Sequence, residues 1–124
     1  ACMVEPLPYL KDEAGRAFLD TRDEELIRVV AIASGLGSSS AYTWLKIPAT
    51  PRMAEVAAAT TMPILMLGGD PGERAPEVIA GWEQAMREPN VRGLIPGRAL
   101  LYPHDGDVEG VVATAARIVH GGGA

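Results

Sequence analysis

The sequence predicts an α/β fold in which parallel strands alternate with helices. Short apolar runs alternate four times with segments that have the periodicity of amphipathic helices. The third run, residues 63–67, is apolar throughout, as is typical of a strand buried on both faces of a parallel sheet. Apolar residues make up 48% of the 124 residues, enough to build a packed core. We therefore expect one domain over residues 1–124.

The four apolar runs define the expected strands. These strands cover residues 2–7, 42–47, 63–67 and 91–95. Pro48 closes the second, because proline cannot donate to a sheet ladder. Turn-forming residues follow the third and fourth strands: Gly68 and Gly69 after one, Pro96 and Gly97 after the other.

The expected helices are marked by their ends. They cover residues 23–34, a segment starting at Pro51, residues 75–87, and a segment from about Asp107 to the glycines that begin at Gly121. Asp23 is expected as an N-cap and Gly35 as a stop. Residues 99–101 are expected to form a short turn, and the segment between the first strand and the first helix a polar loop.

Four βα units in 124 residues correspond to about half of an eight-stranded barrel, which typically needs about 250 residues. The sequence therefore predicts the C-terminal half of a (β/α)8 barrel, with a small open sheet as the rival fold. Either fold leaves two sheet edges and one sheet face uncovered. We expect another copy of the chain, or a missing N-terminal half, to cover them.

Charge and composition exclude several classes of partner and site. The net charge is −5 and the eleven Lys and Arg residues are scattered, which argues against nucleic acid or an anionic membrane surface as partner. No apolar run is long enough to span a membrane, and the start lacks the features of a secretion signal. The single cysteine, Cys2, cannot form an internal disulfide, and no metal-ligand spacing is present. We expect a cytoplasmic protein that uses no metal or cofactor.

Lys46 is the strongest catalytic candidate. It lies between Leu45 and Ile47 near the end of the second expected strand, so strand alternation turns it away from the face that packs on the helices. Apolar surroundings disfavour an ammonium ion, and a neutral amine can attack a carbonyl to form an iminium. The alternative is a lysine that extends to the strand end and forms an ion pair.

Glu5 is expected beside Lys46 on the neighbouring strand. Imine chemistry needs a general acid/base, and a carboxylate next to the amine fits that role. The same geometry equally favours a simple ion pair. Four residues at the ends of the last two strands, Gly68, Gly69, Gly97 and Arg98, are expected to bind a phosphate through backbone amides and a guanidinium. Turns without a ligand are the alternative for the glycines.

Several segments together resemble the C-terminal half of class I aldolases, the group that includes deoxyribose-phosphate, tagatose-bisphosphate and archaeal-type fructose-bisphosphate aldolases. The likeness is greatest to actinobacterial aldolase-like barrel proteins of inositol-catabolism gene clusters. The matching segments are residues 44–48, 57–63, 67–70 and 91–103. Strands one to four of such enzymes have no counterpart here.

The resemblance implies roles for the candidate residues. Lys46 takes the place of the Schiff-base lysine, and Glu5 that of the glutamate of tagatose-bisphosphate aldolases. The two glycine-containing loops take the place of the phosphate-binding positions. The implied reaction is C–C bond cleavage or formation in a phosphorylated keto sugar or keto acid, such as cleavage of a deoxy-keto-gluconate phosphate to dihydroxyacetone phosphate and malonate semialdehyde. The alternative is an inactive half-barrel that binds phosphate or self-associates.

Overall fold

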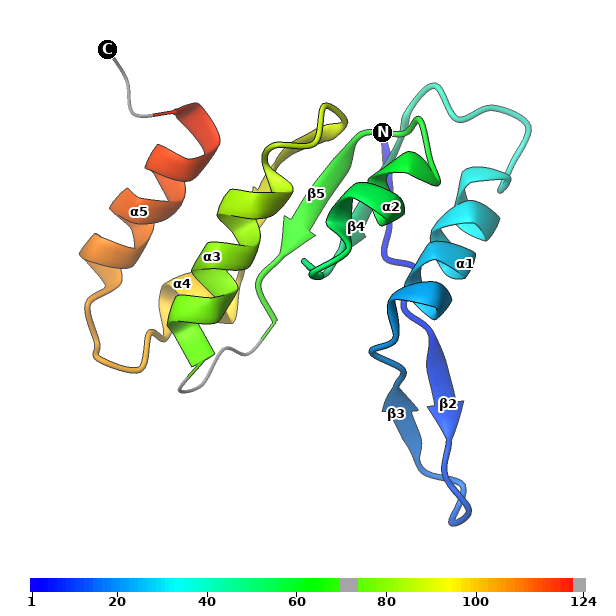
Figure 1. Ribbon diagram of the computed structural model, residues 1–124, viewed down its shortest axis with the longest axis horizontal. Helices are drawn as coiled ribbons and strands as arrows, with labels where there is room; N and C mark the ends of the chain where they lie inside the picture. Colours follow the sequence, from blue (N-terminus) through cyan, green and yellow to red (C-terminus); the bar gives the residue numbers. More distant parts are fainter. Residues whose placement is uncertain (70–73, 122–124) are drawn as a thin grey trace.

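The computed structural model describes residues 1–69 and 74–121, which form two sheets and a set of helices (Figure 1). The strands are β1 (Cys2–Val4), β2 (Tyr9–Lys11), β3 (Ala17–Leu19), β4 (Thr43–Ile47), β5 (Ile64–Leu67) and β6 (Val91–Ile95). The helices are α1 (Asp23–Ser34), α2 (Met53–Ala58), α3 (Ala75–Ala85), α4 (Arg98–Leu101) and α5 (Val108–His120). Within these described residues, no helix combines the length and apolar character needed to cross a membrane.

The main sheet has four parallel strands in the order β1-β4-β5-β6. Helices α1, α2 and α3 lie side by side along the sheet (Figure 1). Because the four strands are parallel, their carboxyl ends all lie at the same end of the sheet, which we call the carboxyl edge. The α/β class with a parallel sheet is therefore confirmed. The half-barrel is not shown as stated, because the strands described form an open four-stranded sheet accompanied by a separate hairpin.

The core explains which face of the sheet each residue occupies. Side chains on one face of the two central strands are fully buried: Leu45, Ile47, Ile64 and Met66. They belong to one apolar cluster with α1, α2 and α3 residues, including Val30, Val56 and Trp82. The alternate residues Trp44, Lys46, Leu65 and Leu67 are only half-buried and face the opposite side. The second face of the sheet is therefore less buried than the first.

The segment expected as a polar loop instead contains an antiparallel hairpin, β2–β3, that extends away from the main sheet (Figure 1). The Asp12 carboxylate closes its turn by accepting the Ala14 and Arg16 N–H groups at 3.0 and 2.8 Å. Gly15 supplies the positive φ of 78°. Strands of only three residues are too short to show an alternating pattern, so the sequence does not predict them.

Helix ends were predicted with mixed success. Helix α5 begins at Val108, close to the expected start near Asp107, and the Asp107 side chain caps it by accepting the Gly110 N–H at 2.9 Å. The N-cap of α1 is Arg22 and not Asp23, which lies in the first helical turn. There the negative charge of Asp23 still interacts favourably with the positive end of the helix dipole.

Candidate functional site

Lys46 and Glu5 lie side by side at the open face of the sheet. The parallel register aligns Val4 with Leu45, so the next residue along each chain falls at the same level. Lys46 Nζ donates a hydrogen bond to Glu5 Oε2 at 3.1 Å, although the two residues are 41 positions apart in the sequence. The fold therefore brings together the two residues predicted to be catalytic.

The environment of this pair is more open than expected. The Lys46 side chain is 25% exposed and the Glu5 side chain 40% exposed. The lysine is thus not enclosed by apolar walls, and it forms the ion pair that was the alternative interpretation of the sequence. The arrangement still has chemical capacity, because a proton can pass between amine and carboxylate over a hydrogen bond of this length.

Gly68 follows β5 and makes the closest approach at the carboxyl edge. A Cβ atom there would lie 2.6 Å from Pro96 Cβ and 3.1 Å from Ala99 Cβ, so any larger residue would clash. The loops after β5 and β6 are therefore in contact, as a shared phosphate site requires. Gly69 adopts a positive φ of 61°. Close contacts at Gly68 and the positive φ at Gly69 each explain why the residue is glycine, without any need for a ligand.

Gly97 and Arg98 begin the short segment after β6. Gly97 is the N-cap of α4, and Arg98 is its first residue. The expected turn at residues 99–101 is thus a helix of four residues that starts one position earlier. All four predicted phosphate-binding residues lie at the carboxyl edge of neighbouring strands. Asp70, the last residue of the segment 67–70, lies outside the described residues.

A cleft of about 660 Å³ adjoins the loop after β5. Gly68, Gly69 and Thr50 are among the residues that line it, whereas Lys46 and Glu5 are not. The Thr50 hydroxyl is buried and has no hydrogen-bond partner within the described part of the chain. Thr50 was not among the predicted site residues, because a threonine in a loop after a strand carries no distinguishing pattern. The cleft and the amine are therefore separate features of the same edge.

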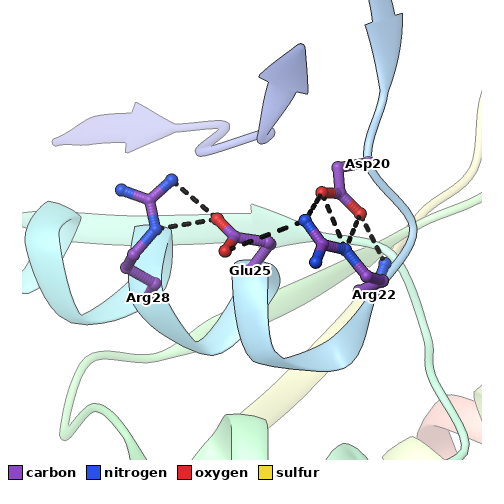
Figure 2. Close-up of polar contacts among 4 residues, drawn as sticks. All are labelled: Asp20, Arg22, Glu25 and Arg28. Atoms are coloured by element: carbon purple, nitrogen blue, oxygen red, sulfur yellow. Dashed lines mark hydrogen bonds and ion pairs between the residues drawn. The ribbon is translucent and has the colours of Figure 1, made fainter.

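A second group of charges lies where the hairpin joins α1 (Figure 2). Asp20 is the only buried charged residue among those described, and its carboxylate accepts hydrogen bonds from the backbone N–H and the guanidinium of Arg22. These hydrogen bonds lower the pKa of Asp20 from its usual 3.8 to about 2. Glu25 lies between Arg22 and Arg28 and pairs with both. This cluster anchors the hairpin to the helix and satisfies its own charges.

Metal-binding chemistry has no support in the part of the chain that the structure describes. Within residues 1–69 and 74–121, no three His, Cys, Asp or Glu side chains converge on a point that could hold an ion.

A solved protein is closely similar to this chain. The crystal structure of Cgl0159 from Corynebacterium glutamicum (Brevibacterium flavum) matches at 47% sequence identity with a TM-score of 0.87. The match covers 95% of this chain and 39% of that chain, so the present chain spans about two fifths of the relative's length. A comparison with curated proteins finds no match.

The model of a protein family, Cgl0159-like, matches residues 1–116. This family assignment conflicts with the resemblance to class I aldolases, and that identification was wrong. The resemblance rested on residues 44–48, 57–63, 67–70 and 91–103, whose main features are a lysine on a strand and glycines at strand ends. Parallel α/β sheets of many functions carry such features, because strand ends need turns and strand-end loops hold polar groups. The chain belongs to the Cgl0159-like family.

Proposed function

We propose that Lys46 and Glu5 form a centre that converts a carbonyl compound into an imine. One observation carries the proposal: Lys46 Nζ lies 3.1 Å from Glu5 Oε2 on the open face of the sheet. An amine within hydrogen-bond reach of a base has the geometry of an activated nucleophile. Partial exposure of both side chains leaves room for a substrate to reach the nitrogen.

The proposed step conserves atoms and charge. The Glu5 carboxylate accepts a proton from the Lys46 ammonium, and the free amine attacks the carbonyl carbon as the C=O π bond breaks. The carbonyl oxygen takes up a proton, the attacking nitrogen loses one, and a neutral carbinolamine results. Glu5, now protonated, gives its proton to the hydroxyl, which leaves as water. An iminium on Lys46 and a carboxylate on Glu5 remain.

An iminium at Lys46 withdraws electrons from the neighbouring carbon–carbon bond. We therefore propose C–C bond cleavage or formation in a phosphorylated keto sugar or keto acid as the reaction. The contact between the loops holding Gly68 and Gly97 supports a phosphate position at the same edge of the sheet. The competing proposal is a phosphate-binding or self-associating module without catalysis. Two observations favour this module. Close contact with Pro96 explains Gly68 without a ligand, and Lys46 already forms an ion pair with Glu5.

Borohydride trapping separates the two proposals. Reduction in the presence of dihydroxyacetone phosphate, followed by peptide mass mapping, should add the reduced ketone to Lys46. Lys11, the only other lysine in the sequence, is exposed on the hairpin and serves as an internal control. Absence of an adduct, or equal labelling of both lysines, would sink the imine proposal and leave the binding module.

The open edges of the sheet support a further part of the proposal. Strands β1 and β6 are the edge strands, and exposed edges are sites where more strands add. We propose that in a longer member of the family these four units form part of a closed barrel, and that the 124-residue chain covers its edges by self-association. Sedimentation of the chain should show a dimer or larger species, whereas a stable monomer would contradict the proposal.

A further inference from the structure

The free edge of β6 borders a hollow of about 490 Å³. Strand β6 pairs with β5 on one side, and no other strand among the described residues pairs with it on the other. The lining of the hollow includes every residue of the segment 92–96. Successive side chains of a strand point to opposite faces, so a hollow that touches all of them runs along the edge of the strand and not over one face.

Helix α5 forms the other wall of this hollow, which we call the β6–α5 groove. Its contribution is mostly aliphatic and comes from Val112, Ala115, Ala116 and Val119. A Cβ atom at Gly93 would lie 4.0 Å from Val119 Cγ1, so the helix packs against the strand at the base of the groove. An edge strand beside an apolar helix wall is the geometry in which an added strand binds, because the edge offers main-chain partners and the groove accepts side chains.

Strand β1 is the opposite edge of the same sheet, and α1 and α5 lie at opposite ends of the row of helices (Figure 1). The Cys2 N–H donates to the Tyr42 carbonyl at 2.7 Å, on the side of β4. Neighbouring residues of a strand direct their backbone groups to opposite sides, so the N–H and C=O of Met3 point to the free edge. Cys2 is exposed and Met3 is 48% exposed. Strand β1 is therefore a short apolar strand with an accessible edge.

We infer that β1 of a second copy binds in the β6–α5 groove, parallel to β6, an inference that rests on the self-association proposed above. Strands β1 and β6 run in the same direction, so the contact extends the parallel sheet. A twofold arrangement fills both grooves at once, since each copy offers one β1 and one groove. Two four-stranded sheets joined in this way make eight parallel strands, the number at which such sheets close into a barrel.

The charges around the groove favour β1 as the occupant. The chain has a net charge of −5, yet the ionisable residues that line the groove are Arg92 and His120, both basic. Strand β1 has no basic side chain, and Glu5 follows it directly. The exposed strand β2 instead contains Lys11, which the basic groove would repel. A second copy of this acidic chain therefore complements the groove best through β1.

Met3→Pro tests the contact without removing a hydrogen bond to β4. Proline is tolerated on an edge strand when its nitrogen faces away from the sheet, and here it removes the N–H that points to the free edge. Sedimentation of the 124-residue chain should show a dimer for the wild type and for Met3→Val, which keeps the N–H. Met3→Pro should weaken the dimer at least about tenfold, as expected for one hydrogen bond lost at each of two contacts. Far-UV circular dichroism verifies that each variant is folded.

Cross-linking through Cys2 provides a second measurement. Cys2 is the only cysteine of the sequence, so Arg92→Cys or Ile95→Cys places one further thiol at the groove. A short bismaleimide should join Cys2 of one copy to the new thiol of the other, and peptide mass mapping identifies the link. Lys11→Cys places the thiol on the exposed hairpin and should give little covalent dimer. The wild-type chain should give little as well, because the two β1 strands lie on opposite sides of the twofold dimer.

The outcomes distinguish the inference from the self-association on which it rests. A monomeric wild-type chain overturns both. A dimer in which neither groove cysteine links to Cys2, or which a folded Met3→Pro leaves as tight as Met3→Val does, overturns only the binding of β1 in the groove. A link between two Cys2 residues in the wild-type chain also overturns it, since β1 would then pair with β1. If Met3→Pro does not fold, the cross-links alone decide.

Discussion

Two ion pairs in this molecule have the same kind of partners and opposite surroundings. Asp20 and Arg22 are two residues apart, and four hydrogen bonds, three of them 3.0 Å long, join the carboxylate to the backbone and guanidinium nitrogens of Arg22. Glu5 and Lys46 are 41 residues apart and share one hydrogen bond of 3.1 Å. The Asp20 side chain is 6% exposed, whereas that of Glu5 is 40% exposed.

The difference separates an anchoring contact from one available for chemistry. At the hairpin junction, local sequence and multiple donors use the hydrogen-bonding capacity of the carboxylate, so little remains for a ligand. At the sheet, only the fold brings the partners together, and each keeps free surface. A single exposed contact contributes about 0–1 kcal/mol to stability. Lys46 and Glu5 can therefore be altered with little effect on folding, which makes the comparison testable.

Glu5→Gln should have the largest effect on chemistry. The amide can still hydrogen-bond but cannot accept and return the proton, so borohydride-trapped imine at Lys46 should form about 100-fold more slowly. The free energy of unfolding, measured by thermal denaturation, should change by less than about 1 kcal/mol. Quenched time courses of labelling with dihydroxyacetone phosphate measure the rate. An unchanged rate would mean that Glu5, like Asp20, is only an ion-pair partner and takes no part in imine formation.

Gly68→Ala should have the largest effect on stability at the carboxyl edge. The new methyl group would lie 2.6 Å from Pro96 Cβ and 2.8 Å from Pro96 Cα. Displacing a backbone segment of this kind costs about 1–3 kcal/mol. Gly97→Ala is the matched control, because a Cβ at Gly97 meets no atom within 4 Å. Urea unfolding of both variants measures the difference. Equal stability would mean that the two loops are free to separate.

The sequence was sufficient to predict the parallel sheet and the placing of Lys46 near Glu5. Apolar runs such as residues 63–67 and the alternation around Lys46 record burial directly, because each residue reflects which face it occupies. The hairpin was missed, since its three-residue strands depend on the Asp12 turn and not on a pattern. Exposure of Lys46 could not be predicted either. It depends on what covers the second face of the sheet, and a strand's own sequence does not specify that cover.

The glycines illustrate a further limit. Gly68 and Gly97 look equivalent in the sequence, since each follows a strand in a turn-forming segment. In the structure, a Cβ added at Gly68 would meet Pro96, whereas a Cβ added at Gly97 would meet only open space. That distinction arises from contacts between two loops nearly thirty residues apart. Composition and spacing alone therefore support a ligand or a turn equally well at both positions.

The smallest expected effect concerns Asp20, and it depends on pH. The folded-state pKa of Asp20 is about 2, below its ordinary 3.8, because Arg22 hydrogen bonds stabilise the carboxylate. Its contribution to stability is therefore complete above pH 3.8 and is lost as the pH falls toward 2. Asp20→Asn should lower Tm by a few degrees at neutral pH, and the gap to the wild-type chain should narrow over that acidic range. A gap that stays constant from pH 7 to about pH 2 would show that the carboxylate charge contributes nothing, and that the contrast with Glu5 rests on burial alone.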